Sequence, residues 1–141
     1  MHPHVTLSPR QFALAVGSVA LGGALGTWLR DVLLKLQPAP ATGAHAPWAQ
    51  AIPWVLLGIN FIGVFLATRL LAGPLRHHDP NDTTRLLVIT GFFGGLTSYS
   101  GLFNDFGVLW HRSIGGCLIV AVAAILSGVL AAWLGLQRWF S

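Results

Sequence analysis

Residues 86–104 form an uncharged run that is bounded by Arg85 and Asp105. As a helix, a run of this length would cross the core of a bilayer, which takes about 20 residues. The run contains two adjacent glycines followed by four hydrogen-bonding side chains at positions 97–100. Glycine weakens a helix, and hydroxyl groups compete for its main-chain bonds. Main chain freed at membrane depth is tolerated only inside protein or beside a wet cavity. We therefore predict a membrane helix that is broken in its middle and has a function there.

The composition indicates an integral membrane protein. Hydrophobic residues make up 54% of the 141 residues and charged residues only 9%, whereas soluble proteins carry about 25% charged residues. The first apolar run lacks the basic region of a signal peptide, so we expect it to be retained as a span. We predict an all-α membrane protein with a single domain over residues 1–141, multi-pass in the inner or plasma membrane. Its four spans are expected at about 11–30, 52–72, 84–104 and 113–138.

Polar residues and glycines within the first two spans have more than one interpretation. Gly22 and Gly26 have the GxxxG spacing that lets another helix approach closely. Arg30 either extends to lipid headgroups or is held inside the bundle by carbonyl groups. Asn60, between Gly58 and Gly63, either makes an interhelical hydrogen bond or contacts an ion or ligand in a pore. The residues alone leave both alternatives open for Arg30 and for Asn60.

The basic residues are almost evenly divided between the two sides of the membrane. With four spans, both termini lie on one side, which would collect five of the basic residues against three on the other. Such a small bias does not select one orientation. The formal charge of +4 fits topology and contact with lipid headgroups better than binding of nucleic acid. The five are Arg10, Arg69, Arg76, Arg85 and Arg138, and the three are Arg30, Lys35 and Arg112.

Three separated motifs resemble those of the Fluc/CrcB fluoride channels. Residues 22–30, GGALGTWLR, are similar to the GG..G...R pattern of the first helix of that family. Residues 57–63, LGINFIG, resemble its N..G element in the second helix. Residues 91–100, GFFGGLTSYS, resemble its third-helix signature GFxGGLTTFS, which is the most specific of the three. The motifs occur in the order of the family and span most of the chain.

The resemblance implies an antiparallel, dual-topology homodimer in lipid, with two pores that export fluoride passively across the cell membrane. It also implies a structural sodium ion at the dimer centre, held by the main-chain carbonyls of Gly94 and Thr97. The pore would be lined by Asn60, by Tyr99 and by a polar track that begins at Ser100. The near balance of basic residues agrees with insertion in both orientations.

The chain departs from the family in the segment that would line the pore. The two phenylalanines of the family's FSTF arrangement fall here on Tyr99 and Leu102, and the threonine between them becomes Gly101. Fluoride is small and strongly hydrated, so a pore must supply donors in place of the water it removes. The Asn60 amide and the hydroxyls of Thr97, Ser100 and Tyr99 are such donors, and aromatic edges are electropositive. Neutral donors bind an anion without trapping it, as conduction requires.

An alternative is a small proton-coupled exporter of the multidrug-resistance type, which is also a four-helix dual-topology dimer. Such a transporter needs an ionisable group inside the membrane. The sequence has no Glu, and we expect Asp31, Asp79, Asp82 and Asp105 all to lie in loops or at the ends of spans. A membrane scaffold without transport activity is a third class, in which the hydroxyl run would only join helices. No nucleophile–base set or phosphate-binding loop indicates an enzyme.

Overall fold

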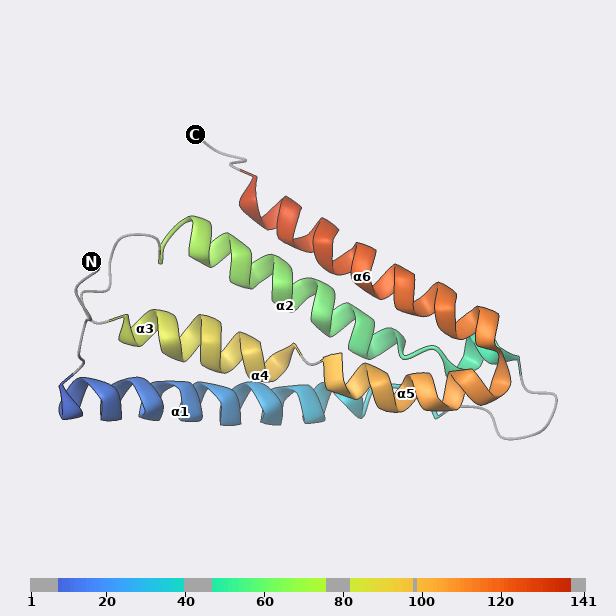
Figure 1. Cartoon of the computed structure of the whole chain (residues 1–141), viewed down its shortest axis with the longest axis horizontal. Coiled ribbons are helices and arrows are strands. Elements are labelled where there is room, and N and C mark those ends of the chain that lie inside the picture. The colour runs from blue at the N-terminus through green and yellow to red at the C-terminus, as the bar shows by residue number, and fades with distance from the viewer. Residues whose placement is uncertain (1–7, 40–46, 76–81, 98, 138–141) are drawn as a thin grey trace, which may run out of the picture.

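Four long helical segments make up the chain in a computed structural model, which describes residues 8–39, 47–75, 82–97 and 99–137. Every regular element within these residues is a helix, and the third segment is divided into four consecutive elements (Figure 1). All four segments are long and apolar enough to cross a membrane. The elements are α1 (Pro9–Leu34), η1 (Trp48–Ala51), α2 (Trp54–Ala72), α3 (Thr83–Arg85), η2 (Leu86–Phe93), α4 (Gly94–Leu96), α5 (Tyr99–Arg112) and α6 (Ile114–Leu136).

The first and last helices are each capped at the N-terminus by a serine side chain. Ser8 and Gln11 form a reciprocal capping box at the start of α1: Gln11 N donates to Ser8 Oγ at 3.3 Å, and Ser8 N donates to Gln11 Oε1 at 3.0 Å. Ser113 accepts from Gly116 N at 3.0 Å at the start of α6. These bonds satisfy main-chain donors that the first turn of a helix leaves free. The start of α1 and the end of α6 lie at the same end of the bundle (Figure 1).

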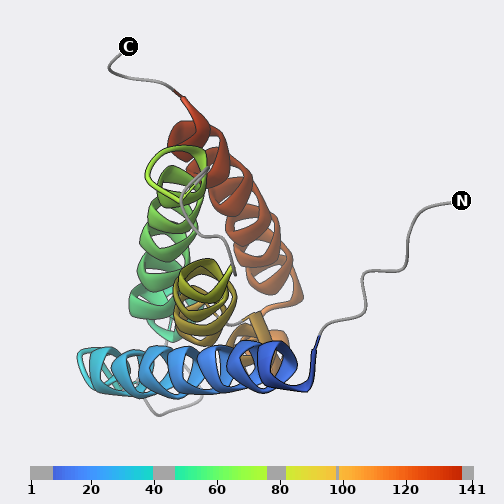
Figure 2. The same ribbon diagram turned by 90° about the vertical axis from the view of Figure 1, so that its left-hand side faces the viewer.

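The third segment is the centre of the bundle. In Figure 2 its first half is seen nearly end-on, with α1 crossing beneath it and with α2 and α6 rising on its other sides. Its buried side chains Phe93 and Leu96 pack with Ile59 of α2. Further along, Leu102 packs with Leu56 of α2 and with Ala124 of α6. Because every other helix contacts this segment, its main-chain path is fixed from several sides.

The closest approach of two main chains lies where α1 crosses η2. A Cβ atom on Gly22 would lie 2.8 Å from Phe92 N, and one on Gly26 would lie 2.8 Å from Leu96 N. A Cβ on Gly91, in turn, would lie 2.9 Å from the Cα of Gly22. The close contact predicted from the GxxxG spacing is therefore confirmed, and it is made within the chain. It leaves Gly22 and Gly26 buried, so their spacing does not support a dimer.

Two features of the third segment differ from expectation. Residues 86–93 form a π-helix, in which hydrogen bonds join residues five apart and the turns are wider than in an α-helix. The segment also does not end near residue 104, because α5 continues to Arg112. Asp105 therefore lies within a membrane-spanning segment, not at its end as predicted.

Candidate functional site

The third segment is interrupted directly after its Gly-Gly pair. Gly94, Gly95 and Leu96 are helical, and the chain leaves the helix at Thr97, where φ is −88° and ψ is 106°. Phe93 O accepts from Thr97 N at 2.8 Å and from Thr97 Oγ1 at 2.7 Å, so one carbonyl closes the last turn. Helical structure resumes at Tyr99. The break predicted in the middle of this segment is confirmed, and it lies at Thr97, the first residue of the predicted hydroxyl run.

Arg30 of α1 reaches this break. Its Nη1 donates to the carbonyl oxygen of Gly95 at 3.3 Å, and its Nε lies 3.7 Å from Asp31 Oδ1. Only 21% of the Arg30 side chain is exposed. A helix that stops leaves the carbonyls of its last turn without their usual donors, and a cation there is favoured by the helix dipole. Of the two alternatives for Arg30, the structure supports the one in which carbonyl groups hold it inside the bundle.

Gly94 and Thr97, the predicted sodium ligands, are separated by the last turn of α4. The extended ψ of Thr97 takes its main chain out of the helix. A carbonyl outside a helix is not used in the helical hydrogen bonds and can point toward an ion. Neutral carbonyl oxygens suit a hard monovalent cation. Main-chain carbonyls at these two positions would be neutral oxygen ligands, a type that suits sodium.

Asn60 lies on the side of α2 that faces the break. A Cβ on Gly63, one turn further along α2, would collide with Thr97 Cγ2, and Leu56, one turn earlier, lies against Gly101. Since α2 runs antiparallel to the third segment (Figure 1), Asn60 is level with the residues between Thr97 and Gly101. Asn60 is 6% exposed. The register of the two helices therefore places this amide beside the interruption.

The remaining predicted pore residues differ in their environments. Ser100, in the first turn of α5, is exposed on the surface of the single chain. The side chain of Tyr99 lies outside the described part of the structure. The Thr97 hydroxyl was expected to donate to an ion. It donates instead to Phe93 O within its own helix. Leu102, at a position where the family has phenylalanine, is only 1% exposed.

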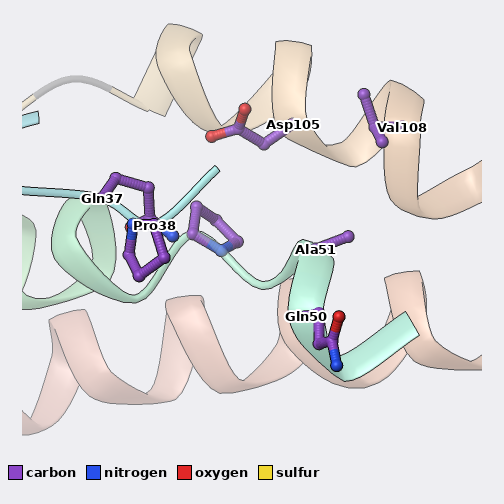
Figure 3. A pocket seen from close by; sticks show the side chains of 7 residues that line it. Gln37, Pro38, Gln50, Ala51, Asp105 and Val108 are labelled. Carbon is purple, nitrogen blue, oxygen red and sulfur yellow. The ribbon is translucent and has the colours of Figure 1, made fainter. Parts of the chain in front are cut away.

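A small hollow lies further along α5, away from these residues. It encloses about 70 Å³ between α5 and the segment that precedes α2, and the Asp105 carboxylate borders it (Figure 3). Gln37, at the end of α1, also lines it; its Nε2 donates to Ile52 O at 3.1 Å, and its Oε1 accepts from Val55 N at 2.8 Å. Neither Asn60 nor Ser100 borders this hollow.

Two structural contacts were not predicted from the sequence, and one was left undecided. Gln37 lies in the connection that follows α1, and its side chain caps the start of α2. Arg69 Nη1 donates to the Gln137 carbonyl at 2.7 Å, at the other end of the bundle from Arg30. A signal for Arg30 was present, since Gly22, Gly26 and Arg30 recur every four residues and therefore share one face of α1. Comparable spacing is absent for Gln37 and Arg69.

Comparison with known proteins shows the relatives of this chain. Residues 18–136 match the family model described as CrcB-like protein, Camphor Resistance (CrcB). Fluoride-specific ion channel FluC 1 of Cutibacterium acnes is 36% identical over 127 residues, which cover 84% of this chain and 80% of the relative. Fluoride-specific ion channel FluC of Chelativorans sp. is 32% identical over 119 residues, with 84% and 90% covered.

A further relative has the same name. Fluoride-specific ion channel FluC of Acinetobacter baumannii is 34% identical over 125 residues, which cover 87% of this chain and 91% of the relative. All three relatives are named as ion channels and none as an enzyme. The family model extends from the middle of α1 to the end of α6 and so includes all four helical segments. This chain therefore belongs to the CrcB-like family and is a multi-pass protein of the cell membrane.

Proposed function

We propose that this protein is a passive, fluoride-selective channel that exports fluoride across the cell membrane. The observation that carries the proposal is the family membership, together with a broken third helix that has Asn60 beside the break. The relatives are named as fluoride-specific channels, which supports fluoride as the ion. Ser100, which begins α5 on the exposed side of the segment, supplies a hydroxyl at the same level. An amide and a hydroxyl are neutral donors, as weak binding of an anion requires.

In this proposal fluoride moves along α5, and protein hydrogen-bond donors replace the water molecules of its hydration shell one after another. Asn60 donates through its amide, Ser100 through its hydroxyl, and Tyr99 lines the path with an aromatic edge and a hydroxyl. Thr97 contributes main chain and not its hydroxyl, because that proton is held by Phe93 O. The path needs a second wall, since Ser100 is exposed on the single chain. A second copy of the chain is the natural source of that wall.

We further propose that the functional unit is an antiparallel, dual-topology homodimer with a structural sodium ion at its centre. The residues that would hold the ion are Gly94 and Thr97, through main-chain carbonyls from both copies. Bound there, sodium would supply a fixed positive charge that neutralises carbonyl dipoles at the subunit contact. Gly94 is exposed on the single chain, as contact with a second copy requires. Thr97 is partly exposed on the single chain.

The second candidate, a proton-coupled exporter, depends on Asp105. The sequence disfavoured this candidate because every acid was expected in a loop or at the end of a span. Asp105 instead lies inside the third segment, so that argument no longer holds. Asp105 borders a separate hollow, however, and Asn60 and Ser100 do not. We therefore expect Asp105 to have no part in ion movement. The names of the relatives also describe channels and not exporters.

Efflux from liposomes tests the proposal. Protein is reconstituted, and the vesicles are loaded with potassium fluoride or potassium chloride. A potassium ionophore is added so that potassium leaves with the anion, and release is followed with an ion-selective electrode. Fluoride should leave rapidly and chloride should not. Asn60→Asp should lower fluoride efflux by about 100-fold or more, because a carboxylate at the path repels the anion and removes the donors. Equal release of both anions, or undiminished fluoride efflux through folded Asn60→Asp, would contradict the proposed path.

The same assay separates the two candidates. Asp105→Asn should leave fluoride efflux within about twofold of the original protein, because the hollow beside Asp105 does not include Asn60 or Ser100. A proton-coupled exporter would instead lose its activity with this change and would need an imposed pH gradient. Loss of transport in folded Asp105→Asn would therefore favour the second candidate.

A further inference from the structure

Two arginines inside the bundle each donate to a main-chain carbonyl of another helical segment. Arg30 of α1 binds Gly95 O at 3.3 Å, and Arg69 of α2 binds Gln137 O at 2.7 Å. Both bonds join residues far apart in the sequence, and both lie at the C-terminal end of a helix. They differ in location: Gly95 is directly before the interruption at Thr97, whereas Gln137 follows the end of α6. The two residues therefore form a natural pair for comparison.

The carbonyl that Arg30 binds is one that the break leaves in need of a donor. The helix stops at Leu96, so the carbonyls of its last turn have no regular continuation. In a membrane, water does not supply the missing donor unless a cavity reaches the site. Phe93 O is satisfied by Thr97, and Gly95 O by the guanidinium of Arg30. Hydrogen bonds from a charged donor are in general stronger than those between neutral groups.

The place of Arg30 is itself fixed by the crossing of α1 with the third segment. Gly22, Gly26 and Arg30 share one face of α1, and the two glycines lie in main-chain contact with η2. Gly95 also touches α1, because a Cβ there would lie 2.5 Å from Gly23 O. The main chains of α1 and α4 are therefore in close contact at this level. These main-chain contacts of α1 with η2 and α4 place the Arg30 guanidinium beside Gly95.

We propose that Arg30 is a positioning residue of the ion pathway: by binding Gly95 O it holds the end of α4 and so sets where Thr97 and Ser100 lie. The inference rests on the proposed function, because it assigns the path to these residues. Arg30 acts here through the main chain and not by attracting the anion. Its charge is partly balanced by Asp31, whose Oδ1 lies 3.7 Å from Arg30 Nε.

Hydrogen exchange followed by mass spectrometry tests the positioning role without reference to transport. The full-length protein in lipid nanodiscs is compared with Arg30→Gln and with the matched variant Arg69→Gln. In Arg30→Gln, amides in peptides that cover residues 94–103 should exchange about tenfold faster, the size expected for a lost bond from a charged donor. Arg69→Gln should leave those peptides unchanged and accelerate exchange only near residues 134–137. Exchange of residues 94–103 within about twofold of the original protein in folded Arg30→Gln would overturn the proposal.

The same proteins, reconstituted into sealed liposomes, give the second readout. Fluoride efflux per folded molecule should fall about tenfold in Arg30→Gln and stay unchanged in Arg69→Gln. If Arg30→Gln does not fold, Arg30→Lys takes its place; it keeps the charge but lacks the planar fork. Lower efflux without faster exchange at residues 94–103 would show that Arg30 attracts the anion, and would overturn the proposal. If no preparation transports fluoride, the proposed function fails, while the exchange data still decide whether Arg30 holds the break.

Discussion

Hydroxyl side chains in the membrane-spanning helices donate mainly to their own helix. Ser18 Oγ lies 2.7 Å from Leu14 O, Thr68 Oγ1 lies 2.8 Å from Val64 O, and Thr97 Oγ1 lies 2.7 Å from Phe93 O. Such bonds satisfy a hydroxyl where water is absent, and they tend to bend the helix. Ser18 and Thr68 are within continuous helices, but the helix of Thr97 ends at that residue. The bond of Thr97 therefore closes a helix end, which makes the residue a structural part of the break.

Leu102 and Phe103 are neighbours in α5 with opposite environments. Leu102 is 1% exposed and packs with Leu56 and Ala124, whereas Phe103 is 72% exposed. The ring of Phe103 contacts that of Phe106 edge to face, at a centroid distance of 6.2 Å. A core side chain therefore stands at a position where the family resemblance implied a residue that lines the pore. Leu102 is therefore expected to act through packing.

We predict that Leu102→Ala lowers the free energy of unfolding by about 2 kcal/mol, because it opens a cavity between α2, α5 and α6. The value is at the lower end of the range for such changes, because apolar surface transferred to lipid loses little. Thermal unfolding in detergent measures the loss. Phe103→Ala is the control, and its effect should stay within about 0.5 kcal/mol. An equal loss in both variants would contradict the assignment of Leu102 to the core of a single chain.

The contact between α1 and η2 is the element-scale feature on which the break depends. A wide π-helix presents the carbonyls of Leu87 and Phe92 to the glycines of α1, so the two main chains touch. π-Helices are rare and often occur at functional sites. Here the π-helix leads directly into the short helix α4 and then into the interruption at Thr97. Any side chain added at the crossing must displace main chain, because main-chain atoms surround both glycines.

We predict that Gly26→Ala is destabilising by about 1–3 kcal/mol or more, since its Cβ would collide with Phe92 O and lie 2.8 Å from Leu96 N. The matched control is Gly17→Ala in the same helix, where a Cβ meets no atom within 4 Å. That change should be neutral or stabilise by up to about 1 kcal/mol, because alanine is the better helix former. Thermal unfolding in detergent measures the stability of both variants relative to the original protein. Unchanged stability of Gly26→Ala would show that α1 and η2 are further apart than described.

The sequence predicted the helical segments, the existence of the break and the close contact at Gly22 and Gly26. These features were predictable because bilayer thickness sets the length of a span and small residues mark contacts between helices. The π-helix was not, because the side chains that suit an α-helix also suit a π-helix. The continuation of α5 to Arg112 was missed because Asp105 was taken as the end of a span. The acid is tolerated because it borders a hollow next to polar loop residues.

At the scale of the whole molecule, the outer faces of the bundle are apolar. On α6, Ile119 and Leu126 are both 62% exposed, and on α1, Phe12 is 61% exposed. Such faces suit lipid or a second copy of the chain. The structure hardly changes the balance of basic residues between the two sides of the membrane, which the sequence set at five against three. Arg30 and Arg69, which are bound by carbonyls, come from opposite sides of the membrane, so the difference between the two sides is preserved.

This small charge difference leads to our last prediction, that the chain inserts in both orientations. Single cysteines are placed at two ends of the bundle, Ala49→Cys in η1 and His78→Cys between α2 and α3, after the buried Cys117 is replaced by alanine. An impermeant thiol reagent applied to intact cells should modify about half of either variant, because the positive-inside signal does not select one orientation. Reagent added after permeabilisation should modify all of both. A chain with a single orientation would instead be labelled completely at one of the two cysteines and not at the other, and an antiparallel dimer would then be excluded.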